Sequence, residues 1–66
     1  MNIGKSMRVA MAMRGMRSNQ LAELLGVTAP TISVMSARRT CSGLVLQKLA
    51  AVFEMKVSEF VALGED

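Results

Sequence analysis

The sequence predicts an all-α fold, a compact bundle of five short helices. Apolar residues recur at helical spacing in successive short segments, glycines or polar loops separate those segments, and no two segments alternate as paired strands do. The chain has 66 residues, of which 52% are apolar, which is enough for one small core and argues against disorder. We therefore expect a single domain over residues 1–66.

The first two helices are expected to begin at polar caps and to end at glycines. The first is expected over Ile3–Arg14, where apolar residues have helical spacing and Asn2 can serve as the N-cap. The second is expected over Asn19–Leu25, with Ser18 as its cap and Gly26 as the left-handed residue that ends it.

Three further helices follow in the second half of the chain. The third is expected over Ala29–Ala37, because Pro30 is tolerated only in the first turn of a helix. The fourth is expected over Gly43–Phe53, where apolar residues recur at i, i+3, i+4 and i+7. The fifth is expected over Glu59–Leu63, with Ser58 as its cap.

The composition argues against an enzyme, a metalloprotein and a membrane protein. The chain has no histidine, tryptophan or tyrosine, so we expect no catalytic residue, metal, cofactor or small-molecule substrate. Cys41 is the only cysteine, which excludes an internal disulfide and favours a bystander thiol over a redox switch. The longest apolar runs are five residues, too short for a membrane span. Met7, Met11 and Met35 are expected to fill the core, the alternative being a methionine-rich peptide groove.

Charge is distributed unevenly along the chain. Residues 1–39 hold six basic residues against Glu23 alone, a net charge of +5. Residues 40–66 hold two basic and four acidic residues, a net charge of −2. This asymmetry predicts a surface for a polyanion in the first half of the chain and another role for the C-terminal part.

The stretch 21–35 predicts two helices that cross closely around a tight turn. Ala22 is small where the helices approach, and Gly26 supplies the positive φ that lets the chain reverse. Val27 is expected to fill the turn, and Ile32 to pack the later helix onto the earlier one. This is the spacing of a helix-turn-helix, whose second helix enters the major groove of DNA.

From Ile3 to Leu63 the chain resembles the lambdoid phage repressor/Cro type of helix-turn-helix protein. The residues that fall where this family has its core and turn positions are Met16, Leu21, Ala22, Gly26, Val27, Ile32, Ser33, Arg38, Arg39, Leu49, Ala50, Val57 and Phe60. The resemblance implies a transcriptional regulator that binds double-stranded operator DNA in the cytoplasm of a bacterium, or of the host cell if the protein is phage-encoded. The length is more similar to a Cro-type protein than to a full repressor.

Four positions depart from the family's pattern. Ser18 stands where a glutamine usually opens the second helix, and Arg38 stands where a glycine often ends the third. Met11 and Ser36 occupy the positions of an ion pair that commonly joins the first and third helices. Because both charged partners are replaced together, no buried charge is left unpaired.

The resemblance also implies which residues contact DNA. The base-reading residues are expected to be Ala29, Pro30, Ser33 and Val34. The phosphate-contacting residues are expected to be Arg17, Ser18, Thr28, Thr31, Arg38, Arg39 and Ser42. Ser33 has the one strong polar group on the reading face, so the other side chains there are expected to contact thymine methyl groups. The alternatives are that Ala29 and Pro30 only begin a helix and that the basic side chains are simply solvated.

One small domain contacts too little DNA for tight and specific binding, so a homodimer on a pseudo-palindrome is expected. The expected dimer interface consists of Val57, Phe60, Val61 and Leu63. The alternative for Phe60 and Leu63 is that they only close the core. A second hypothesis for the function is a protein-binding module, antitoxin-like or antirepressor-like, which suits an apolar reading face but not the basic first half of the chain.

Overall fold

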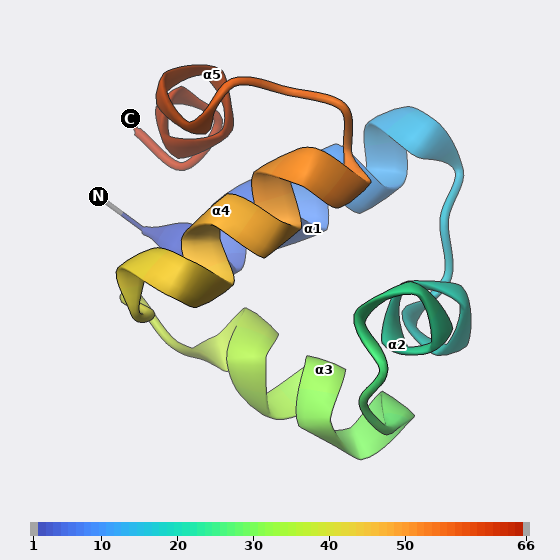
Figure 1. Ribbon diagram of the computed structural model, residues 1–66. Helices are drawn as coiled ribbons and strands as arrows, with labels where there is room; N and C mark the ends of the chain where they lie inside the picture. Colours follow the sequence, from blue (N-terminus) through green and yellow to red (C-terminus); the bar gives the residue numbers. More distant parts are fainter. Residues whose placement is uncertain (1, 66) are drawn as a thin grey trace.

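Five α-helices make up most of residues 2–65, the part of the chain that the computed structural model describes (Figure 1). They are α1 (Ile3–Arg14), α2 (Ser18–Leu25), α3 (Ala29–Ala37), α4 (Gly43–Val52) and α5 (Val57–Ala62). The described residues form no strand, and the predicted all-α fold is confirmed. No helix among them is long and apolar enough to cross a membrane.

The predicted helix starts are confirmed where a cap side chain accepts a backbone hydrogen bond. Asn2 Oδ1 accepts from the Lys5 N–H at 3.1 Å, and Ser42 Oγ accepts from the Val45 N–H at 3.3 Å. Each bond satisfies one of the amides that a helix leaves without an internal partner at its N-terminus. The structure therefore begins α1 and α4 at the residues that the sequence predicts.

The predicted caps Ser18 and Ser58 are wrong. α2 already begins at Ser18, after Arg17, whose backbone N–H donates to Gln20 Oε1 at 2.8 Å. In the same way α5 begins at Val57, after Lys56, whose N–H donates to a Glu59 carboxylate oxygen at 3.1 Å. In both helices a side chain three residues inside the helix reaches back to its start, so no serine cap is needed.

All five helices contribute to one core, in which α3 packs against α1 and α2, and α4 packs against α2 and α5. The buried apolar residues are Ile3, Met7, Ala10, Leu21, Ala22, Ile32, Leu49, Ala50, Phe53 and Phe60. The rings of Phe53 and Phe60 are stacked with centroids 5.8 Å apart, which joins the end of α4 to α5. Met7 is fully buried and Met11 and Met35 pack partly buried against this core, as predicted.

The last described turn of the chain closes against the start of α1. Ser6 is fully buried, and its hydroxyl lies 3.3 Å from the Asn2 carbonyl oxygen and 3.5 Å from that of Val61. Gly64 lies so close to Asn2 that a Cβ atom there would collide with the Asn2 carbonyl group. The first turn of α1 is thus held between the C-terminal segment and the rest of the bundle, and α5 and the start of α1 lie on the same side of the molecule in Figure 1.

Candidate nucleic-acid interface

The turn between α2 and α3 has the geometry that the sequence predicts. Gly26 ends α2 with φ 72° and ψ 31°, a left-handed conformation that glycine adopts at little cost. The Val27 N–H then donates to the Ala22 carbonyl at 2.9 Å, which closes the end of the helix. Ala22 is only 4% exposed, consistent with a small residue at the crossing of two helices. These contacts fix the direction in which α3 leaves α2.

Val27 does not fill the turn, and that expectation is wrong. Its side chain is 39% exposed, and it lines a surface hollow of about 260 Å³ with Leu25, Thr31, Met35, Val45 and Lys48. The turn is held by the backbone geometry of Gly26 and by the close packing of Ala22, so it needs no apolar side chain inside it.

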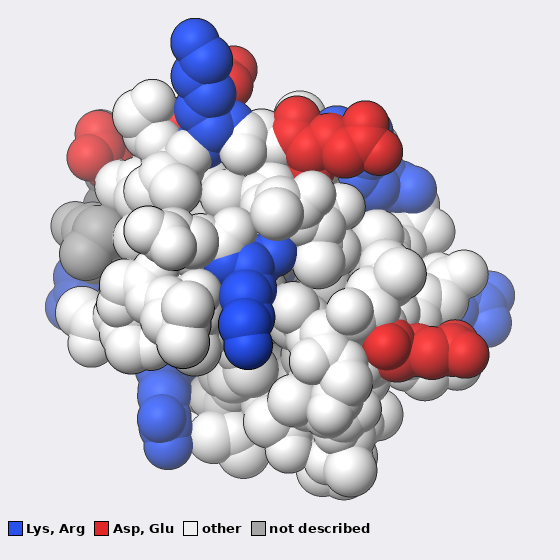
Figure 2. Space-filling view, in the orientation of Figure 1, with Lys and Arg blue, Asp and Glu red and all other residues white. Residues whose placement is uncertain are grey.

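α3 is attached to the core by the buried Ile32 and the partly buried Met35, and much of the helix stays exposed. Ile32 is 1% exposed, while Pro30, Ser33 and Val34 on other faces of α3 are exposed, Val34 to 53%. Ala29, at the first position of the helix, is partly buried. Among the four expected base-reading residues, three are therefore accessible and the fourth partly so. The surface over α3 is mostly uncharged in Figure 2.

The hydroxyl groups of α3 and of its cap residue Thr28 differ in their hydrogen-bond partners. The Thr28 and Thr31 hydroxyl oxygens lie 2.9 Å apart and form a hydrogen bond with each other. The Ser36 hydroxyl donates to the Ser33 carbonyl at 2.9 Å. The hydroxyl of Ser33 itself has no hydrogen-bond partner within residues 2–65, so it is available to a ligand.

The segment after α3 is held by its backbone and exposes two arginines. The Arg38 N–H donates to the Met35 carbonyl at 3.1 Å, which ties the segment to the end of α3. The carbonyls of Arg38 and Arg39 accept hydrogen bonds from the amides of Gly4 and Ile3, each at 2.8 Å. Both arginine residues are exposed. A cationic loop is thereby fixed beside the exposed face of α3.

A model of the Cro/C1-type HTH DNA-binding domain matches residues 6–66 of the chain, that is, all five helices except the start of α1. The chain belongs to this family. Comparisons with curated proteins and with solved structures found no match. The chain therefore carries a Cro/C1-type DNA-binding domain, and the resemblance predicted from its sequence is confirmed.

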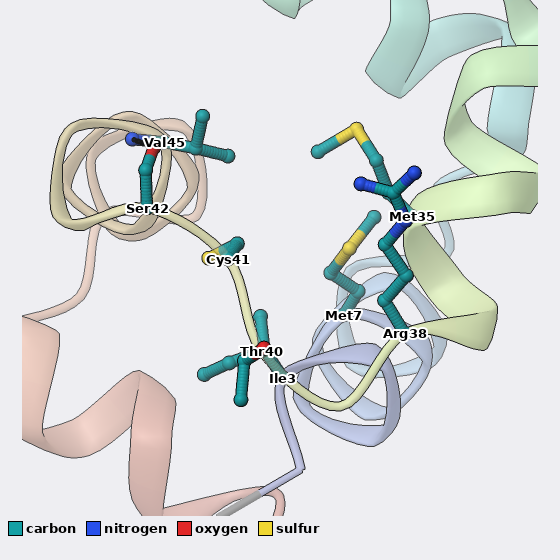
Figure 3. A pocket seen from close by; sticks show the side chains of 8 residues that line it. All are labelled: Ile3, Met7, Met35, Arg38, Thr40, Cys41, Ser42 and Val45. Carbon is teal, nitrogen blue, oxygen red and sulfur yellow. Dashed lines mark hydrogen bonds between the residues drawn. The ribbon is translucent and has the colours of Figure 1, made fainter.

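Figure 3 shows how the cationic loop of this Cro/C1-type domain packs over a pocket of about 270 Å³. The Arg38 side chain lies beside Met7 and extends toward Met35, and all three line the pocket. Cys41 is partly buried in the same loop. Desolvation by burial raises the pKa of the Cys41 thiol, which favours the neutral and less reactive form.

The positions where the family commonly has an ion pair face each other in this chain too. Met11 of α1 and Ser36 of α3 line one surface hollow, together with Ser18 at the start of α2. Both residues are partly buried. The replacement of the two charged partners by a thioether and a hydroxyl thus leaves no buried charge in this hollow.

Not all of the basic residues in the first half of the chain are free to meet a polyanion. Arg14 Nη2 donates to the Phe53 carbonyl at 2.5 Å and so caps the C-terminal end of α4. A cation is favourable there because the helix dipole places partial negative charge at that end. Arg17 is exposed beside the start of α2. Basic side chains on the face in Figure 2 are separated rather than gathered into one patch.

Phe60 cannot serve as a surface for a second copy, and this part of the expected dimer interface is wrong. Its side chain is fully buried and stacks on Phe53, because α5 closes the core from that side. Val61 and Leu63 are partly buried against the core, and Val57 is 38% exposed. The exposed apolar area near α5 is therefore small.

Two features of this surface were not predicted from the sequence. Gly4 lies buried against the cationic loop, and nothing in its neighbouring residues indicates that a glycine is required there. Leu44, at the start of α4, is 64% exposed although it belongs to an apolar helix. The close approach at Gly4 joins segments that are far apart along the chain, and the exposure of Leu44 depends on which helices cover α4, and periodicity reports neither.

Proposed function

We propose that this protein is a sequence-specific transcriptional regulator of the Cro type, encoded by a phage or prophage, and that it represses from a pseudo-palindromic operator. In this proposal residues 1–66 form one DNA-binding domain without catalytic residue, cofactor or small-molecule substrate, at work in the cytoplasm of a bacterium or of the phage host. One observation supports it most: α3 is held to the core by Ile32 and Met35 and presents an exposed face beside a fixed cationic loop.

α3 lies in the major groove in this proposal, with Ala29, Pro30, Ser33 and Val34 facing the bases. The Ser33 hydroxyl, which has no partner within the described residues, makes the polar contact to a base edge. The methyl groups of Ala29 and Val34 and the proline ring contact the 5-methyl groups of thymines. Sequence preference then depends on thymine methyls and on DNA shape rather than on paired hydrogen bonds from glutamine, asparagine or arginine.

The phosphate contacts in this proposal come from three places around α3. They are the start of α2 with Arg17 and Ser18, the start of α3 with Thr28 and Thr31, and the loop before α4 with Arg38, Arg39 and Ser42. Helix N-termini suit this role because their free amides and positive dipole end favour an anion. The arginines of the loop add full positive charges, which provide most of the affinity for any DNA sequence.

We further propose that two copies bind one operator, because a single module of this size reads too few base pairs. Val57, Val61 and Leu63 are the candidates for the contact between the copies, since each retains some exposed or partly exposed apolar surface near α5. This area is small, which favours association on DNA over a stable dimer in solution.

A protein-binding module is the second candidate, and the exposed apolar residues of α2 and α3 favour it. Leu24 is 61% exposed and Val34 is 53% exposed, and both lie on the helix-turn-helix. An apolar partner surface would bury these residues, as interfaces between proteins do at their centres. The separated basic side chains in Figure 2 are compatible with such a partner.

A salt titration of DNA binding distinguishes the two functions. The purified protein is mixed with a fluorescent duplex selected from a random pool, and with a scrambled duplex, between 50 and 300 mM salt. A DNA-binding regulator should prefer the selected duplex and lose affinity linearly on a logarithmic salt scale. Absence of a preferred duplex, together with affinity that does not change with salt, would favour the protein-binding module.

A further inference from the structure

The first turn of α1 is completed by its own cap residue, Asn2, and by the cationic loop. The first amides of a helix have no partner inside it. Here the amide of Lys5 bonds the Asn2 side chain, whereas those of Ile3 and Gly4 bond the carbonyls of Arg39 and Arg38. Two loop carbonyls therefore act as the cap of α1, and α1 in turn fixes the backbone at the two arginines.

This contact requires a glycine at position 4. A Cβ atom placed on Gly4 would collide with the carbonyl groups of Ser36 and Arg38. Both are backbone groups, which cannot rotate away as the end of a long side chain can. Any other residue at position 4 must therefore push the end of α3 and the loop away from α1.

The loop is thus held from two sides. The Arg38 N–H bonds the Met35 carbonyl at the end of α3, and the Arg38 carbonyl bonds the Gly4 amide at 2.8 Å. The two bonds together set where the Arg38 and Arg39 Cα atoms lie relative to α3. Gly4 is buried and cannot itself meet a ligand from solution.

We propose that Gly4 is a positioning residue for nucleic-acid binding, which places Arg38 and Arg39 so that their guanidinium groups meet the DNA backbone while α3 lies in the groove. This inference rests on the proposed function and extends it to a residue on another helix that does not touch DNA. A displaced loop leaves both arginines present but no longer in register with the phosphates beside α3. Both the affinity and the number of released counterions then fall.

Phe53→Leu provides a control for Gly4→Ala that also lowers stability. Phe53 is buried at the end of α4 and stacks on Phe60, so a smaller side chain there leaves a cavity. Phe53 takes no part in the backbone hydrogen bonds that hold Arg38 and Arg39. Both variants should melt at a lower temperature than the wild type, so stability alone cannot separate them.

The experiment measures binding to a fluorescent duplex between 50 and 300 mM salt, at a temperature where circular dichroism shows both variants folded. Gly4→Ala should bind about tenfold more weakly to every duplex, with a salt slope lower by about 1 to 2. Phe53→Leu should keep the wild-type slope and affinity. In a Gly4→Ala background, Arg39→Ala should cost less affinity than in the wild type, which a purely structural role for Gly4 does not predict.

Equal binding by folded Gly4→Ala and Phe53→Leu would overturn the inference and leave the proposed function intact. Absence of salt-dependent DNA binding by the wild type would overturn both. If Gly4→Ala does not fold, Asn2→Ala replaces it, because loss of the Asn2 cap loosens the same turn without a collision. A reduced salt slope for Asn2→Ala supports the positioning role, and an unchanged slope contradicts it.

Discussion

The exposed face of α3 and the loop that follows it are neighbours with opposite chemistry. The α3 face presents methyl groups, a proline ring and the Ser33 hydroxyl, and none of its residues is charged. The loop presents Arg38 and Arg39, both exposed. A helix that reads bases with arginine obtains charge and sequence preference from the same side chain. In this chain sequence preference comes from the α3 face and positive charge from the loop, so a substitution can remove one and leave the other.

The two segments are also held in different ways. α3 depends on the left-handed turn at Gly26 and on the burial of Ile32. The loop depends on backbone hydrogen bonds to Gly4 and Ile3, at the start of α1. A change in the turn should therefore disturb the α3 face, and a change in α1 should disturb the loop.

The largest effect is expected from Gly26→Val, which tests how α3 is held. A β-branched residue at φ 72° is strained, and we expect the free energy of unfolding to fall by about 1–3 kcal/mol. Gly43→Val is the matched control, because an added Cβ meets no atom at either glycine and Gly43 lies in a helix. The control should change stability by about 1 kcal/mol or less. Urea unfolding of both variants provides the measurement, and equal stabilities would contradict the assigned turn.

Ala29→Gln should give the α3 face the paired hydrogen bonds that it lacks. A glutamine at the first position of α3 can bond both N6 and N7 of adenine, so discrimination at the facing base pair should reach about 1–3 kcal/mol. Ala62→Gln, on the exposed side of α5, serves as the control and should leave the base preference unchanged. Competition between duplexes with each of the four base pairs measures the preference. An unaltered preference for Ala29→Gln would mean that position 29 does not face a base.

Arg38→Ala and Arg39→Ala should weaken binding to all sequences alike. One lost phosphate contact corresponds to a slope change of about 0.9, or roughly eightfold in affinity at 0.1 M salt. Arg14→Ala is the matched control, since Arg14 bonds the Phe53 carbonyl and should affect stability without changing the slope. If an arginine variant instead changed which duplex is preferred, that arginine would belong to the base-reading surface.

Local signals in the sequence were sufficient for the helices and for the turn that places α3. A glycine at position 26 indicates a left-handed residue there, because few other residues adopt that conformation. Pro30 indicates the first turn of α3, because proline is excluded from later turns of a helix. Ala22 at a helix crossing follows from the same turn. These predictions required no knowledge of distant contacts.

Predictions that depended on tertiary contacts succeeded less well. The left-handed residue after α4 is Glu54, with φ 57°, which no sequence rule indicates. The sequence left Phe60 either in the dimer surface or in the core, and its packing against Phe53 places it in the core. The need for a glycine at position 4 could not be predicted either, because it arises from backbone carbonyls more than thirty residues away along the chain. Residue type alone does not report which segments of the chain meet.

Replacing operator thymines by uracil, one position at a time, tests most directly whether the α3 face reads methyl groups while the loop supplies charge. The substitution removes one methyl group and leaves every base-pairing and groove hydrogen-bonding group in place. Each contacted methyl group should contribute about 0.8 kcal/mol, so its loss should weaken specific binding roughly fourfold. Binding to scrambled DNA, which depends on Arg38 and Arg39, should not change. If specific binding were equally tight with uracil at every operator position, methyl readout by α3 would be contradicted.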